Sequence, residues 1–168
     1  EWPTPLTVSD YSRRGMGLIR RHALPGVPMY SGRLSVADIQ RRIDTCYRPY
    51  RSALTHVIER SHAQFGQVVH VDAHSMKSRA NAMNVDNGAM RPDIVVSDRH
   101  GTTADAALTS WAAEWFRAQG YATQVNTPYQ GGDLVAHFGQ PAAGRHSVQV
   151  EINRRLYMNY SAFERSAG

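Results

Sequence analysis

Two segments of the sequence place side chains capable of chemistry along apolar strands. In VVHVDAHSMKS, residues 68–78, a run of valines leads into Asp72, His74 and Ser75. A neutral imidazole that projects from a strand end is a good metal ligand, and the Asp72 carboxylate could orient it. A hydrogen-bonded core histidine would show the same pattern, and neither an HExxH helix nor a CxxC pair accompanies it. His74 is therefore a candidate metal ligand with a structural alternative.

Glu151 is the second candidate, because it is a lone carboxylate in the otherwise apolar segment VQVEI. A carboxylate there is costly unless it is paired, hydrated or working as a general base. The structural alternative is an ion pair with Arg154 or Arg155. We expect either a catalytic base or a buried ion pair at this position.

Further polar residues follow other predicted strands. Asp98, Arg99 and His100 come directly after the segment IVVS, where they suit either a site or a polar turn before a helix. His137 lies in a long glycine-rich loop of the kind that forms either a lid or a mobile surface. Ser75 lacks a GxSxG elbow, which argues against an α/β-hydrolase triad.

Alternating apolar segments predict the elements that position these residues. A helix should begin after the cap Ser35, with Asp38 in a capping-box arrangement, and run to about Phe65, with a kink or a junction of two helices at Pro49. A second helix should begin after Thr102 or Thr103 and end at Gly120, and a third should close the chain. Four strands are expected at residues 67–73, 93–97, 121–127 and 146–152.

Strands alternating with helices predict an α/β fold, a three-layer α/β/α arrangement around a mostly parallel mixed sheet. The strand at residues 67–73 is apolar on both faces and should be central. Ligands of such sheets bind outside the carboxyl ends of the strands. We therefore expect DAHS, SDRHG and the loop after YATQVNT to meet at one edge of the sheet.

The bulk composition suits one soluble domain over residues 1–168, with 42% hydrophobic and 20% charged residues. No apolar run reaches the ~20 residues of a membrane span. Cys46 is the only cysteine, which excludes an intrachain disulfide and favours a reducing, cytoplasmic compartment. Cys46 falls in the first predicted helix and is expected to be a core residue.

The net charge of +5 raises the alternative of a basic nucleic-acid-binding module. Lys77 is the single lysine among 19 basic residues, and the arginines are scattered along the chain. A nucleic-acid binder more often shows a basic stripe with interleaved aromatic residues. The pattern argues against nucleic acid as the partner.

Several motifs, taken in order, resemble the N-formylglutamate amidohydrolase (deformylase) family. They are GLIRR, MYSGRLSVADIQRRIDTCYRPYRSAL, VVHVDAHSMKS, IVVSDRHGTTAD and NTPYQGGDLVAHFGQPAAGRHSVQVEINRRLYMN. The resemblance extends from about residue 15 to 160. It implies a fold like that of the zinc carboxypeptidases, a phosphorylase/hydrolase-like architecture, and hydrolysis of an N-formyl or N-acyl amino acid.

The resemblance also implies roles for individual residues. His74 becomes a zinc ligand and Glu151 the general base that acts on a zinc-bound water, whose pKa zinc lowers to ~7. Asp72 and Ser75 would support the metal ligand, and His137 could donate to the developing oxyanion. The arginines that could clamp substrate carboxylates are Arg79, Arg99 and Arg154.

The chain departs from the family at its start. Relatives carry a Pro-His-Ser-Gly-like motif with a later acidic residue, which would supply the remaining zinc ligands, and nothing in residues 1–30 matches it. We therefore expect the carboxyl-terminal part of a larger amidohydrolase domain, whose exposed sheet edge is covered by another copy or by the missing segment. The alternative is a metal-free, non-catalytic relative that binds a small anionic ligand.

Overall fold

The computed structural model describes residues 10–13, 15–24, 26–81, 84, 86, 88–159 and 164–166. The helices are α1 (Asp10–Arg13), α2 (Val36–Arg42), α3 (Arg48–Phe65), α4 (Ala106–Ala118) and α5 (Asp133–Phe138), with a π-helical turn η1 (Ile43–Tyr47) and 3-10 turns η2 (Pro141–Ala143) and η3 (Arg154–Leu156). The strands are β1 (His22–Leu24), β2 (Val27–Pro28), β3 (Val68–Met76), β4 (Ile94–Ser97), β5 (Thr123–Val125), β6 (Arg145–Asn153), β7 (Met158–Asn159) and β8 (Glu164–Arg165). The architecture is α/β, as the sequence predicts.

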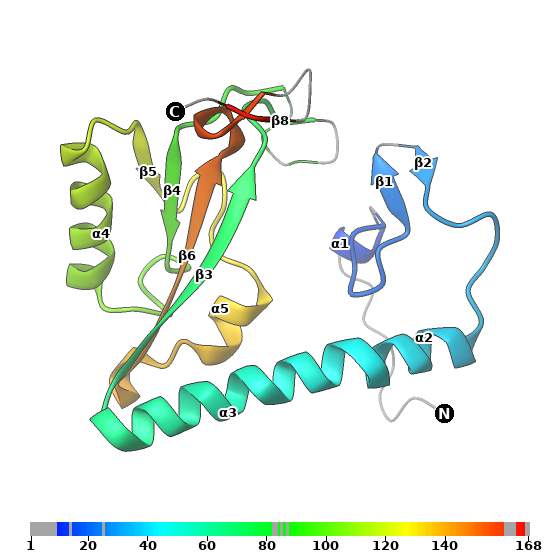
Figure 1. Ribbon diagram of the computed structural model, residues 1–168, viewed down its shortest axis with the longest axis horizontal. Coiled ribbons are helices and arrows are strands. Elements are labelled where there is room, and N and C mark those ends of the chain that lie inside the picture. The colour runs from blue at the N-terminus through cyan, green and yellow to red at the C-terminus, as the bar shows by residue number, and fades with distance from the viewer. Residues whose placement is uncertain are drawn as a thin grey trace.

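A long helical rod joins the β1–β2 hairpin to the central sheet (Figure 1). Its start is the predicted one, because the Ser35 side chain accepts a hydrogen bond from the Asp38 backbone N–H at 3.1 Å. The predicted interruption takes the form of η1, which precedes Pro49 in the first turn of α3. Cys46 lies in η1 and is exposed, so its prediction as a core residue is wrong.

The central sheet has four strands in the order β3-β6-β4-β5. β3 pairs with β6 and β4 with β5 in parallel, whereas β4 and β6 are antiparallel. The mostly parallel mixed sheet is thus confirmed, but two of its strands run opposite to the other two. The turn after β4 therefore lies beside Ser147, toward the amino end of β6, where Thr103 exchanges hydrogen bonds with Ser147. The prediction that DAHS and SDRHG share one edge is wrong.

Helices cover both faces of this sheet (Figure 1). On one face Ile94 and Val96 pack against Ala113 of α4 and form the buried core cluster. α5 contacts β6 and β3 on the other side, and α3 lies beyond it, where the Arg51 guanidinium stacks over the Phe138 ring. These contacts give the predicted three-layer arrangement.

β3 is an edge strand of the described sheet, not the central strand that its valines predict. Val69 and Val71 are 49% and 53% exposed, because α4 packs mainly against β4 and β5. The strand also extends through Met76, three residues beyond the predicted end. Asp72, His74 and Ser75 therefore lie within the strand, where successive side chains point to opposite faces.

The end of the chain also differs from the prediction of a closing helix. After β6 the chain makes the single 3-10 turn η3 and then forms the short β7–β8 pair. Within the described residues, no helix combines the length and apolar character needed to cross a membrane.

A buried carboxylate organises the turn after β4. Asp98 accepts hydrogen bonds from Thr109 Oγ1 at 2.7 Å, Asn126 Nδ2 at 2.7 Å and the Gly101 N–H at 2.9 Å. Arg99 and His100 adopt positive φ angles of 53° and 59°, a strained conformation for non-glycine residues. The hydrogen bonds to Asp98 hold this turn in place. The helix after it begins at the cap Asp105, not at Thr102 or Thr103.

Replacing Asp98 by Ala should cost about 3 kcal/mol of unfolding free energy at neutral pH, because charge-assisted hydrogen bonds in a buried network are lost. Burial alone would raise the pKa of Asp98, but the hydrogen bonds from Asn126, Thr109 and Gly101 outweigh it and lower the pKa below its ordinary value. The stabilisation is therefore complete above the ordinary carboxyl pKa and is lost as the pH falls through the lowered one.

Urea unfolding at several pH values measures this difference. The matched control is Asp105→Ala, which removes the exposed cap of α4 and should cost only about 1 kcal/mol. Equal losses for the two variants would contradict the role of Asp98 as the organiser of the turn.

Candidate active site

The register of β3 against β6 brings the two principal candidates together. His74 pairs with Glu151 and Asp72 pairs with Gln149 across the parallel ladder. Paired residues of neighbouring strands project to the same face of a sheet. The four side chains therefore share the face on which α5 lies, and a cluster forms from residues more than 70 positions apart.

His74 lies between two carboxylates. Its Nε2 is 3.2 Å from Asp72 Oδ1, and its Nδ1 is 3.7 Å from Glu151 Oε1. Since an ionised carboxylate can only accept, the Asp72 contact places a proton on Nε2. Nδ1 then faces Glu151, and the His74 side chain as a whole is half exposed. A carboxylate that orients a histidine in this way is typical of metal ligands and of catalytic histidines.

Glu151 is only 5% exposed although it is a carboxylate. Burial raises its pKa above the ordinary value, while His74, Arg91 and the hydrogen bond from Gln149 oppose part of that rise. A carboxylate with a raised pKa is a better proton acceptor near neutral pH than a solvated one. The predicted ion pair with Arg154 or Arg155 is absent among the described contacts, since Arg154 bonds Ser75 and Arg155 bonds Asp93.

Two residues beside Glu151 are absent from the sequence prediction. Gln149 donates from Nε2 to Glu151 Oε1 at 2.9 Å. Arg91 is buried, stacks over the Tyr129 ring at 5.0 Å and forms hydrogen bonds of 2.8 and 3.0 Å to Asp86. The two-residue period of a strand could have identified Gln149, because it shares a face with Glu151. No sequence signal places Arg91, whose position depends on the fold of the loop between β3 and β4.

The remaining predicted residues are spread around this cluster. Ser75 accepts from Arg154 Nε at 3.1 Å, but it faces the opposite side of β3 from His74, so it does not support the histidine directly. Arg79 donates to the Gly88 carbonyl at 2.9 Å within the β3–β4 loop. Arg99 donates to the Gly131 carbonyl at 3.0 Å, next to the loop that reaches Gln149.

His137 does not join the cluster. It lies in the last turn of α5 and lines a cavity of about 110 Å³ together with Glu59 of α3 and Arg145. Arg145 begins β6, six residues before Glu151, which corresponds to about 20 Å along a strand. This placement argues against the predicted role of His137 as an oxyanion donor beside Glu151, because α5 runs back along β6 and carries its last turn away from the site.

The metal-binding groups are only partly assembled. The described residues contain no cluster of three or more His, Cys, Asp or Glu side chains that could hold a metal ion. His74 Nδ1 and Glu151 Oε1 are donors that zinc accepts, but together they fill only two positions of a coordination sphere that takes four. The described residues therefore do not form a complete zinc site.

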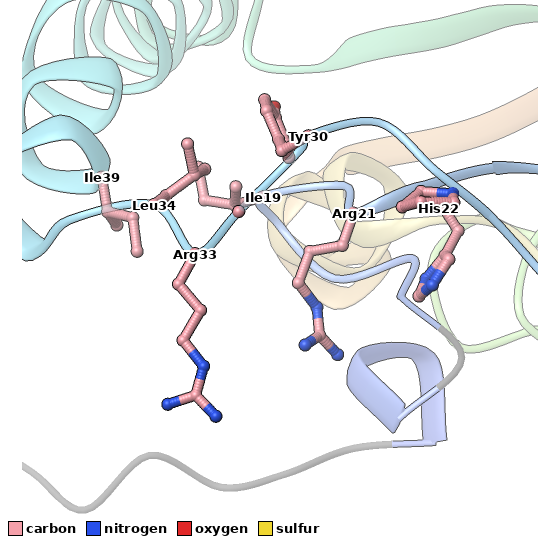
Figure 2. A pocket seen from close by; sticks show the side chains of 9 residues that line it. Ile19, Arg21, His22, Tyr30, Arg33, Leu34 and Ile39 are labelled. Carbon is pink, nitrogen blue, oxygen red and sulfur yellow. The ribbon is translucent and has the colours of Figure 1, made fainter.

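A larger cavity lies elsewhere, among residues 19–39. It measures about 480 Å³, and Arg21 and Arg33 extend from it toward the same side (Figure 2). Its walls are largely apolar, from residues such as Ile19, Leu34 and Ile39. None of the predicted site residues lines it, so its size does not make it the centre of the chemistry.

Comparison with known proteins decides the family. The model of the family described as N-formylglutamate amidohydrolase matches residues 3–158, which is nearly the whole chain. The chain belongs to the N-formylglutamate amidohydrolase family. The cluster of Asp72, His74, Gln149 and Glu151 falls inside the matched region.

Three members of this family are similar to the chain, two compared by sequence and one by structure. An N-formylglutamate deformylase of Pseudomonas aeruginosa is 29% identical over 90% of this chain, and one of Pseudomonas putida is 28% identical over 88%. The crystal structure of an N-formylglutamate amidohydrolase from Ralstonia eutropha JMP134 superimposes with a TM-score of 0.91 at 39% identity over 100% of this chain. The chain spans 57%, 55% and 60% of the lengths of these three relatives, respectively.

Replacing Glu151 by Gln should leave the fold of this family member intact. The change removes a buried charge but keeps the shape and an oxygen that can accept from Gln149, so the unfolding free energy should change by less than about 1 kcal/mol. Glu151→Ala should cost about 2–3 kcal/mol, because it leaves a cavity and an unpaired Gln149 donor. Urea unfolding of both variants tests this. A large loss in Glu151→Gln would mean that the charge itself holds the structure together.

Proposed function

We propose that the chain carries the catalytic carboxylate of an amidohydrolase that cleaves the N-formyl group from an amino acid, with N-formylglutamate as the first substrate to test. The observation that carries this proposal is the buried Glu151 whose Oε1 lies 3.7 Å from the oriented ring of His74. Family membership supports the reaction class, since relatives over most of the chain are named N-formylglutamate deformylases.

The proposed reaction assigns proton transfer to one residue of the cluster. Hydrolysis of an amide needs a base that removes a proton from water and returns a proton to the leaving nitrogen, and we assign both steps to Glu151. Asp72 holds the His74 ring so that Nδ1 faces the same space. The burial of Glu151 limits the water that competes with the reaction.

Three arginines outside the cluster are proposed to bind the carboxylates of the substrate. Arg79, Arg99 and Arg154 each donate one or two hydrogen bonds within the chain, and a guanidinium carries five N–H donors. Within the described part of the chain, donors therefore remain on each of the three arginines for a planar carboxylate. Arg91 is less suited, because Asp86 already occupies it through two bonds.

Zinc remains part of the proposal as a group that the family resemblance implies. When bound, zinc would polarise the amide carbonyl and acidify water. His74 Nδ1 fits one ligand position, since its other ring nitrogen contacts Asp72 as metal-bound histidines usually require. The roles derived above for Glu151 and Asp72 do not depend on that metal.

Formate release from N-formylglutamate tests the catalytic proposal. Glu151→Gln should reduce the rate by at least about 100-fold, because the general base is lost while the fold persists. His137→Ala is the matched control, since His137 lies on the far part of α5, and its rate should stay within about 3-fold of the unmodified chain. Turnover by Glu151→Gln at a normal rate would rule out Glu151 as the base.

Elemental analysis of the purified chain tests the metal proposal separately. With two donors assembled among the described residues, we expect the chain to retain well below one zinc per molecule through gel filtration, and His74→Ala to lower the retained zinc further. One zinc per chain that survives His74→Ala would contradict the assignment of His74 as a ligand.

A further inference from the structure

A buried amide connects Glu151 to the loop that follows β5. Gln149 is 4% exposed and lies on the same face of β6, two residues before Glu151. Its Nε2 donates to Glu151 Oε1 at 2.9 Å, and its Oε1 accepts from the Gly132 backbone N–H at 2.8 Å. Each arm of the amide thus has a partner of its own.

The orientation of this amide is fixed by its partners. The backbone N–H of Gly132 can only donate, so it requires the carbonyl oxygen of Gln149. The ionised Glu151 carboxylate can only accept, so it requires the NH2 group. Neither an ionised glutamate nor a hydrophobic side chain of equal length can satisfy both neighbours at once.

The two carboxylate oxygens of Glu151 differ in their contacts. In the described part of the chain, the hydrogen bond from Gln149 and the approach of His74 both involve Oε1, and no donor there reaches Oε2. Holding one oxygen of a carboxylate fixes the rotation of the group and leaves the second oxygen to receive a proton. A misplacement of a catalytic group by about 1 Å can cost 10²-fold in rate.

We propose that Gln149 is a positioning residue, which acts by holding Glu151 Oε1 so that Oε2 is presented to the reacting water. The inference rests on the proposed function of Glu151 as the base. It assigns to Gln149 a role in the rate of the reaction and not chiefly in the stability of the fold.

The loop itself does not depend on Gln149 alone. The Tyr129 carbonyl accepts from the buried Ser97 hydroxyl at 2.8 Å, and the Gln130 carbonyl accepts from the Arg99 N–H at 2.9 Å. Arg99 also donates to the Gly131 carbonyl. Three hydrogen bonds to the loop therefore remain when the bond to Gly132 is lost. By contrast, Gln149 supplies the one side-chain hydrogen bond that Glu151 receives in the described part of the chain.

Two substitutions of nearly equal size separate these roles. Gln149→Glu keeps an acceptor for Gly132 but places a carboxylate against Glu151, and Gln149→Met removes both hydrogen bonds. If Gln149 positions Glu151, kcat for formate release should fall by at least about 100-fold in Gln149→Glu and about 10-fold or more in Gln149→Met, with KM changed less than about 3-fold. Gln124→Glu, at an exposed position of β5, is the control for the added charge and should behave like the unmodified chain.

The opposite pattern would overturn the proposal. If Gln149 only anchors the loop, Gln149→Glu should retain normal turnover and Gln149→Met should raise KM or lower the urea midpoint. Normal kcat in Gln149→Glu, from a chain that releases formate, would therefore leave the proposed function standing and remove the positioning role.

A spectroscopic readout covers failure of the proposed function itself. The side-chain amide protons of Gln149 should exchange slowly with solvent in nuclear magnetic resonance spectra, and Glu151→Ala should remove that protection. If the unmodified chain releases no formate but shows this Glu151-dependent protection, the proposed function fails while the contact is supported. Rapid exchange in the unmodified chain would overturn the contact whatever the activity.

Discussion

The parallel register between β3 and β6 is the constraint on which the candidate site depends. It sets His74 opposite Glu151 and Asp72 opposite Gln149, so that four polar side chains face one another across two strands. A slip of one residue would turn every one of these side chains on the shifted strand to the other face of the sheet. Val150, between Gln149 and Glu151, then matters as much as the polar groups, because it packs against the core cluster and so specifies which face of β6 is which.

The buried polar face of β6 comes at a cost that the structure offsets locally. Ser147, Gln149, Glu151 and Asn153 are all nearly inaccessible, on the face opposite the apolar core against α4. Buried polar groups without partners each cost about 1–3 kcal/mol. Each of these side chains bonds a specific neighbour instead: His70, Gly132, Gln149 and Ser78 are the respective partners. Glu151 alone keeps an oxygen without a described donor, as a working base requires.

Sequence patterns predict the elements well where the signal is local. The capping pair Ser35 and Asp38, the helix that continues to Phe65 and the strand at β6 all depend on neighbouring residues, and the structure contains each of them. The chemical pairing of His74 with Asp72 is local too, because residues two apart on a strand share a face.

The direction of β4 relative to β6 is not predicted by the sequence, for a physical reason. Whether β4 runs with or against β6 depends on contacts between residues about 50 positions apart, and alternating helices and strands favour the parallel choice in general. The antiparallel β4 moves the Asp98 turn away from the carboxyl end of β3. His137 is misplaced for a related cause, since the short helix α5 was expected as loop and its direction along β6 has no sequence signal.

The Asp98 turn is nevertheless connected to the site by hydrogen bonds through the loop after β5. Asp98 fixes the strained Arg99, Arg99 holds the carbonyls of Gln130 and Gly131, and the next residue bonds Gln149, which holds Glu151. The Asp98 carboxylate, whose partners are structural, is thereby linked through one short loop to the Glu151 carboxylate, which is proposed to act on water. Strain at Arg99 and His100 is compatible with such a link, because non-glycine residues keep positive φ angles only where surrounding contacts fix them. The loop after β5 thus belongs to the rigid framework of the site, since Ser97 of β4, Arg99 of the turn and Gln149 of β6 hold four of its consecutive residues.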